Sequence, residues 1–140
     1  LTLGSCFSDH IGNRLRRHLF NTLVNPFGTI FNPVSMAYLL GKVIVNSNIS
    51  LEELNSVGER YFHYDFHSSF DSTDPHLILN RLNSALSKTS EALQKTDFLI
   101  LRPFHGRKGQ AMPYSESNGF LHSFLVMPLD GLATACSSNL

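Results

Sequence analysis

The sequence has 140 residues, a length that fits one domain, and 42% of them are hydrophobic, which is enough to fill a core of ordinary size. The 11 Lys and Arg residues balance the 11 Asp and Glu residues, so no net charge draws the chain to nucleic acid, an anionic membrane or an acidic substrate. Its two cysteines, Cys6 and Cys136, show neither a disulfide framework nor a zinc-site spacing, so we expect a reducing, cytoplasmic compartment and a small neutral or modestly polar substrate.

No apolar run reaches the roughly 20 residues that a membrane-spanning helix needs, and no basic and then apolar leader precedes the first predicted strand. We therefore expect no membrane segment, no metal and no other cofactor, while the oligomeric state has no signature in the sequence. The chain begins at Leu1, which already belongs to an apolar segment, so we also expect a few residues to be missing upstream.

The first predicted elements are a strand, a helix and a second short strand. Residues 1–3 form the end of a buried strand, and Gly4 breaks it. An amphipathic helix follows from Ser8, its predicted N-cap, because apolar residues recur every four positions over residues 11–19. Residues 21–24 are β-prone and are followed by a turn cluster.

Two further helices and a strand are predicted in the middle of the chain. The second helix begins at Pro33 with Asn32 as its cap, and it is largely apolar. Residues 51–57 predict a short helix, and residues 60–68 predict a strand in which aromatic residues alternate with His and Asp. A third helix is predicted over residues 75–93, because its apolar residues form one stripe.

Residues 97–101 are short, continuous and apolar, which is typical of a buried parallel strand. Strands separated by helical crossovers of this length predict a parallel sheet with helices on its faces, so the fold class is α/β. Beyond this strand, Gly, Pro and polar residues interrupt every period. We therefore predict a folded unit over residues 1–101 and leave residues 102–140 as an unassigned tail.

The turn from Gly4 to Phe7 is the richest candidate for a functional site, because ligands bind beyond the carboxyl ends of the strands in open α/β sheets. It places the thiol of Cys6 and the hydroxyl of Ser5 where backbone amides begin a helix, which favours a thiolate and offers donors to a developing oxyanion. Ser and Gly are also usual in an ordinary strand-to-helix turn, and unreactive cysteines are common. The residues alone leave both interpretations open.

The residues His63, Asp65 and His67 alternate along the strand predicted at residues 60–68. On such a strand all three would face one side, a spacing that can bind a metal ion when a fourth ligand is added. We favour the alternative, a half-exposed strand whose aromatic residues face the core: Phe62, Tyr64 and Phe66.

Four segments, taken in order and with their intervals, resemble the GSCFA family: Leu3-Gly4-Ser5-Cys6-Phe7-Ser8, Asn25-Pro26-Phe27-Gly28, Asn32-Pro33-Val34-Ser35 and Phe66-His67-Ser68-Ser69-Phe70. That family is grouped with the SGNH or GDSL-type hydrolases. The resemblance implies a three-layer α/β/α, flavodoxin-like fold with a parallel sheet. It also implies an esterase-like or acylhydrolase activity on a small-molecule ester or acyl substrate.

When the chain is aligned with the GDSL-type pattern Gly-Asp-Ser-Leu, Gly4 corresponds to the Gly and Ser5 to the Asp. Cys6 then corresponds to the nucleophilic Ser and Phe7 to the Leu. The resemblance therefore implies that Cys6 is the nucleophile and that Phe7 contributes an amide to the oxyanion site. Ser5 as nucleophile, with Cys6 packed behind it, is the competing assignment. A thiol at its ordinary pKa is only a few per cent ionised at neutral pH, so a nucleophilic Cys6 needs a base.

The resemblance also implies positions for the remaining parts of the site. Gly28 corresponds to a glycine whose amide helps to form the oxyanion hole, although a turn glycine with positive φ is an equal alternative. His67 and Ser68 are expected to border the substrate pocket.

The resemblance ends sharply after residues 97–101, where Arg102-Pro103-Phe104-His105 replaces a Gly-Thr-Ala-Trp-like turn. No Asp-x-x-His, the usual place of the catalytic histidine, occurs in residues 102–140. We therefore expect a truncated or frame-shifted tail and a chain that lacks part of its active site, including the base. The rival hypothesis is a non-catalytic α/β module that binds a ligand or a partner, with the Gly4 turn as an anion site.

Overall fold

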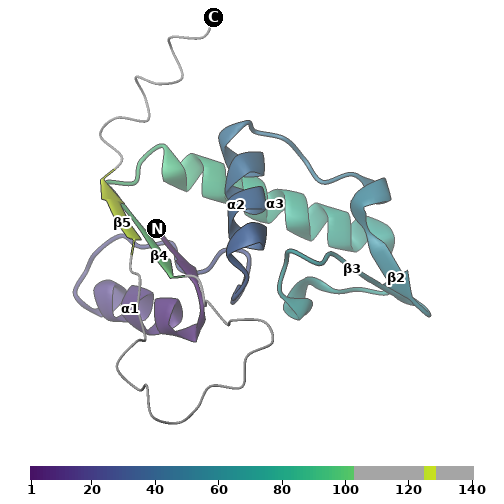
Figure 1. Ribbon diagram of the computed structural model, residues 1–140, viewed down its shortest axis with the longest axis horizontal. Helices are drawn as coiled ribbons and strands as arrows, with labels where there is room; N and C mark the ends of the chain where they lie inside the picture. Colours follow the sequence, from purple (N-terminus) through teal and green to yellow (C-terminus); the bar gives the residue numbers. More distant parts are fainter. Residues whose placement is uncertain (103–124, 129–140) are drawn as a thin grey trace, which may run out of the picture.

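The computed structural model describes residues 1–102 and 125–128. A small sheet and helix α1 lie at one end, a β-hairpin lies at the other, and helix α3 runs along the length between them (Figure 1). The helices are α1 (Cys6–Arg17), α2 (Pro33–Ile44) and α3 (Pro75–Leu93). Within the described part of the chain, no helix has the length and hydrophobicity to cross a membrane.

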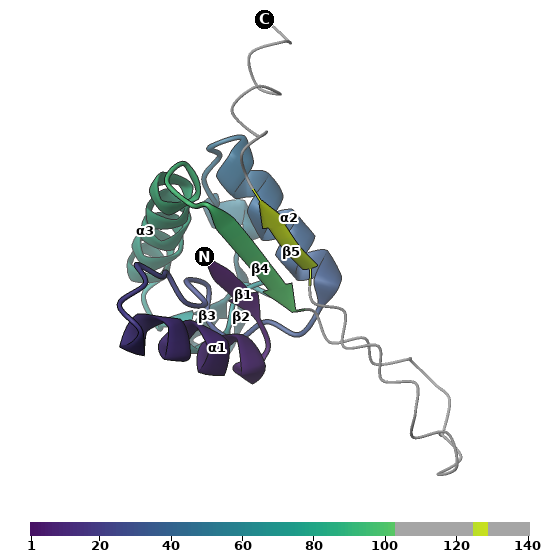
Figure 2. The same cartoon turned by 90° about the vertical axis from the view of Figure 1, so that its left-hand side faces the viewer.

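The sheet has the order β1-β4-β5, and its three strands lie side by side in Figure 2. Strand β1 (Thr2–Gly4) pairs in parallel with β4 (Phe98–Arg102), so that Gly4 lies opposite Arg102. This parallel pair, joined by helical segments, confirms the predicted α/β class. Strand β5 (Leu125–Pro128), which the sequence does not predict, pairs with β4 in the antiparallel direction.

Helix α1 begins two residues before its predicted N-cap. Ser5 is the N-cap, with the extended backbone that this position requires (φ −70°, ψ 176°). Ser8 is instead inside the helix and buried, and its hydroxyl donates to the carbonyl oxygen of Leu3 at 3.1 Å. The predicted strand at residues 21–24 is reduced to one bridge, between Val24 and Thr2.

The other two helices begin where the sequence predicts. The side chain of Asn32 accepts from the amide of Val34 at 3.0 Å, and Asp74 accepts from the amide of His76 at 2.8 Å. Each cap is followed by a proline at the first helical position. The apolar stripes of α2 and α3 meet in the core, whose most buried members include Leu39, Val43, Ile78 and Leu82.

The segment between α2 and α3 differs from its prediction. The short helix predicted at residues 51–57 is one 3-10 turn, η1 (Leu51–Glu53), followed by strand β2 (Asn55–Val57). The strand predicted at residues 60–68 is limited to β3 (Arg60–Phe62), which pairs with β2, and a second 3-10 turn, η2 (Ser68–Phe70), follows.

The chain turns directly after β3, because the Nδ1 atom of His63 accepts from the amide of Asp65 at 3.2 Å. This turn ends the alternation of faces that a strand would impose. As a result His63 and Phe66 are buried, while Tyr64 is 75% exposed. The prediction that Tyr64 faces the core is therefore wrong.

Candidate functional site

Gly4 forms the turn between β1 and α1 in a conformation that only glycine adopts readily. Its φ is +140°, and a Cβ atom placed on it would lie 2.2 Å from the carbonyl oxygen of Arg102. The amide of Ser5 donates to that same oxygen at 3.3 Å. The close approach of β4 to the end of β1 therefore requires Gly at this position.

Cys6 is the first residue of α1, and its side chain is exposed, whereas Ser5 is only 7% exposed. The first amides of a helix have no acceptor in the α-helical pattern, and here the amide of Ser8 donates to the carbonyl oxygen of Ser5 at 2.8 Å. The guanidinium of Arg102 lies 4.0 Å from the ring centre of Phe7, so a positive charge lies beside the start of the helix. Of the two candidate nucleophiles, only the thiol is accessible to a ligand.

Asn25 holds the Gly4 turn in place. It is buried and has a left-handed backbone with φ +40°. Its Oδ1 accepts from the amide of Gly4 at 2.9 Å, and its Nδ2 donates to Oδ1 of Asp9, in the first turn of α1, at 2.7 Å. The hydroxyl of Thr29 reaches the other oxygen of Asp9 at 3.5 Å. These bonds connect the turn, the helix and the following loop.

The sequence pattern does not predict Asn25 or Asp9 as site residues. Asn25 belongs to a predicted turn cluster, and Asp9 to the predicted helix that follows Ser8. The one local signal is that Asn tolerates the left-handed backbone found here, whereas its bond to Gly4, 21 positions away, has no local signal.

Gly28 has φ +77°, and a Cβ atom on it would lie 2.3 Å from the Cβ of His67. Its amide donates to the carbonyl oxygen of Asn25 at 2.8 Å, which closes a turn. Gly28 is therefore a turn glycine with positive φ, which is one of the two alternatives that the sequence left open. Donation from this amide to a ligand would require the turn to open.

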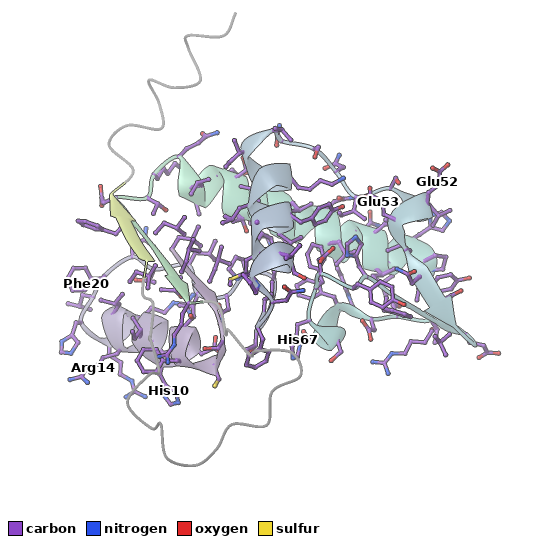
Figure 3. All side chains as sticks on the ribbon, viewed as in Figure 1. His10, Arg14, Phe20, Glu52, Glu53 and His67 are labelled. Carbon is purple, nitrogen blue, oxygen red and sulfur yellow. The ribbon has the colours of Figure 1, made fainter. Side chains whose placement is uncertain are left out.

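The loop at residues 25–30 lies between the Gly4 turn and His67. The amide of Ile30 donates to the carbonyl oxygen of Gly4 at 2.9 Å, and the amide of His67 donates to the carbonyl oxygen of Phe27 at 3.2 Å. Figure 3 shows His67 on the lower side of the molecule, between α1 and the β2–β3 hairpin. The 25–30 loop, which contains Gly28, is thus bonded both to Gly4, two residues before Cys6, and to His67.

The ring of His67 has a defined orientation. Its Nδ1 accepts from the amide of Ser69 at 3.1 Å and lies 3.0 Å from the hydroxyl of the same residue. A backbone amide only donates, so Nδ1 of the neutral ring is unprotonated and Nε2 holds the proton. His67 and Ser68 are both exposed.

The three residues considered as metal ligands do not share one face. His63 is buried against Tyr38, with ring centres 6.0 Å apart, while His67 lies on Gly28. The Nδ1 atoms of both histidines accept backbone amides. No three His, Cys, Asp or Glu side chains within residues 1–102 come together closely enough to hold a metal ion.

Two titratable clusters lie away from the Gly4 turn. Burial lowers the pKa of His63, against the opposing charges of Asp65 and Glu53. Burial on its own would raise the pKa of the Glu53 carboxyl, but bonds from the Tyr38 hydroxyl, the Ser50 amide and Lys42 together lower this pKa to about 2. Lys42 lies 2.9 Å from Glu53 and so connects α2 to η1.

A groove of about 500 Å³ opens beside the 25–30 loop, between Pro26, Phe70 and the exposed face of α3. A second groove of about 300 Å³ lies between α1, the end of α3 and the sheet. Neither groove is lined by Cys6, Gly28 or His67.

Comparison with known proteins identifies one family, since the sequence profile of the GSCFA family matches residues 1–103. No curated protein sequence matches the chain, and no solved structure matches it. The matched residues contain the Gly4 turn, the 25–30 loop, His67 and strand β4 up to Arg102. Since the match covers well over half of the chain, the protein belongs to the GSCFA family.

Proposed function

We propose that the chain holds the nucleophile half of an acyl hydrolase site, with Cys6 as the nucleophile. The observation that supports this most directly is the accessible thiol of Cys6 at the first helical position, next to a hydroxyl on Ser5 that is buried. The turn that presents the thiol is fixed by Gly4 and Asn25. Family membership agrees with this assignment but does not by itself supply an activity.

In the proposed reaction the Cys6 thiolate attacks the carbonyl carbon of a small ester or acyl compound in the cytoplasm. The carbonyl electrons move to oxygen, and the amides at the start of α1, including that of Phe7, stabilise this oxyanion. Collapse of the intermediate breaks the bond to the leaving alcohol and leaves a thioester, which water hydrolyses. Gly28, His67 and Ser68 border the substrate in this arrangement.

The base is proposed to come from outside the described residues, because no histidine within residues 1–102 forms a hydrogen bond with Cys6. The histidines of the tail, His105 and His122, lie outside the described residues, as does the expected frame shift beyond β4. Without a base, we expect this chain to perform only the first half-reaction, through the few per cent of a thiol that is ionised at neutral pH, and only with an activated ester whose leaving group departs as an anion.

The experiment is stopped-flow measurement of p-nitrophenolate release from p-nitrophenyl acetate by the purified chain. We expect a burst of about one equivalent per chain, abolished in Cys6→Ala and retained in Ser5→Ala. A burst lost in Ser5→Ala and kept in Cys6→Ala would transfer the nucleophile to Ser5. The absence of any burst, from a chain whose Cys6 reacts with iodoacetamide, would refute the acyl transfer proposal.

A second candidate function, anion binding without catalysis, is favoured by the guanidinium of Arg102 beside the start of α1. It predicts that inorganic phosphate protects Cys6 from iodoacetamide and that p-nitrophenyl acetate gives no burst.

A further inference from the structure

His67 is exposed, yet its backbone amide, its Cβ atom and the Nδ1 atom of its ring each have a contact. The amide of the residue donates to Phe27, the Cβ packs on Gly28 where any side chain would collide, and Nδ1 binds Ser69. The bond to Ser69 makes His67 the N-cap of η2. It also orders a ring that would otherwise rotate in water, and so it fixes the direction of the other ring nitrogen, Nε2.

The bond to Ser69 also fixes the chemistry of Nε2. Because Nδ1 accepts from a backbone amide, the proton of the neutral ring is on Nε2. A nitrogen that already has its proton cannot remove one from a thiol. It donates a hydrogen bond, and in the described part of the chain no acceptor is bonded to it.

The position of His67 relative to the Cys6 turn is fixed by the same loop. The amide of Gly4 donates to the side chain of Asn25, and its carbonyl oxygen accepts from the amide of Ile30. The amide of His67 donates to Phe27 in the same loop. His67 and the turn that presents Cys6 are therefore bonded to the same loop, and a donor that is positioned before the substrate arrives requires little reorganisation during the reaction.

We propose that His67 is a hydrogen-bond donor to the acyl substrate, acting through Nε2–H on the carbonyl oxygen that becomes the oxyanion, and that it is not the base. This inference rests on the proposed function of Cys6. In the acylation step the thiolate forms the C–S bond, the oxyanion collapses, and the leaving group departs as an anion. The proton on Nε2 stays in place throughout.

Two substitutions separate the two nitrogens of the ring. In His67→Asn the side-chain oxygen takes the place of Nδ1 and keeps the bond from the Ser69 amide, but the distal donor is lost. In His67→Gln the side-chain amide reaches the place of Nε2 and keeps a donor, but the cap to Ser69 is lost. If the role of His67 is structural, His67→Asn should acylate faster than His67→Gln. If His67 donates to the substrate, His67→Gln should be the faster variant.

The experiment compares two reactions of the Cys6 thiol in the whole chain, with Cys136 replaced by Ser in every variant. Acylation by p-nitrophenyl acetate develops an oxyanion, whereas alkylation by iodoacetamide does not. We expect His67→Asn to slow acylation roughly 100-fold, in the range seen when one oxyanion donor is removed, and to leave alkylation within about twofold of the wild type. His67→Gln should acylate faster than His67→Asn.

Acylation by His67→Asn at the wild-type rate, or faster than by His67→Gln, would overturn the inference and leave the proposed function of Cys6 intact. A wild-type chain that alkylates but does not acylate would overturn both. Long-range ¹H–¹⁵N correlation spectra of labelled wild-type chain give an independent test, since an Nε2–H signal for His67 supports the donor role and an Nδ1–H signal refutes it.

Discussion

The side-chain oxygen of Asn25 accepts the amide hydrogen of Gly4 at 2.9 Å, and this single bond joins two segments that lie 21 positions apart in the chain. Both groups are buried, so neither finds water as a substitute. The bond orients the residue that precedes Ser5 and Cys6. The geometry of the candidate nucleophile therefore depends on a loop that the sequence presents only as a turn.

Replacing Asn25 by Ala should destabilise the fold. The amide of Gly4 loses its acceptor in a buried place, which costs roughly 1–3 kcal/mol, and Ala adopts the left-handed backbone less readily than Asn. Urea unfolding followed by circular dichroism measures this loss. Asn21→Ala is the control, because Asn21 is exposed and such surface changes stay within about 0.5 kcal/mol. Equal stability of the two variants would show that the Asn25 bond contributes nothing.

Gly28→Ala should destabilise more than Gly58→Ala, although both glycines have positive φ. The left-handed backbone alone costs roughly 1–2 kcal/mol for a residue with a side chain, and this applies to both positions. At Gly28 the new methyl group also meets His67 at 2.3 Å, whereas at Gly58 nothing lies within 4 Å. Thermal unfolding measures the difference in stability between the two variants. We expect this difference to be smaller in a His67→Gly background, which lacks the Cβ atom that the new methyl group meets.

Stability should fall as the pH is lowered from 7.5 to 5.5, because His63 is buried. Its pKa in the folded state lies below the ordinary value of 6.5, so the unfolded chain binds a proton first. The contribution of His63 is thus complete above pH 6.5 and is lost as the pH falls towards the folded pKa. The change in unfolding free energy between pH 7.5 and pH 5.5 should therefore be smaller in His63→Gln than in the wild type.

His10→Gln is the control for this pH effect, since His10 lies exposed on α1 (Figure 3). A wild-type pH dependence that persists unchanged in His63→Gln would assign the effect to another group.

Glu53→Gln should destabilise the fold at pH 7, whereas Glu52→Gln should not. Both residues lie on η1 in Figure 3, but only Glu53 binds Tyr38 and Lys42. Its pKa of about 2 lies below the ordinary value of 4.5, so its contribution is present above pH 4.5 and is lost as the pH falls towards 2. The stability difference between Glu53→Gln and the wild type should therefore disappear by about pH 2, as acid titration of circular dichroism would show.

Local features of the sequence were sufficient wherever a cap and an apolar stripe occur together. The starts of α2 and α3 follow from Asn32 and Asp74, each before a proline. The same reasoning misplaced the start of α1, because Ser5 and Ser8 are equally good caps in isolation. In the folded chain the Ser8 hydroxyl donates to the carbonyl oxygen of Leu3, so Ser8 does not cap the helix and Ser5 is the N-cap.

Periodicity, caps and short motifs were sufficient for the α/β class, for the parallel sheet and for the Gly4 turn as the place of the two candidate nucleophiles, because these features depend on residues that are close together in the chain. Three outcomes depend on the tertiary fold: Cys6 is accessible while Ser5 is buried, His63 and His67 lie in separate environments, and Gly28 is needed where His67 packs. These outcomes depend on which distant backbone groups meet. No local pattern encodes that, because the bond between Asn25 and Gly4 forms only once the chain has folded back on itself.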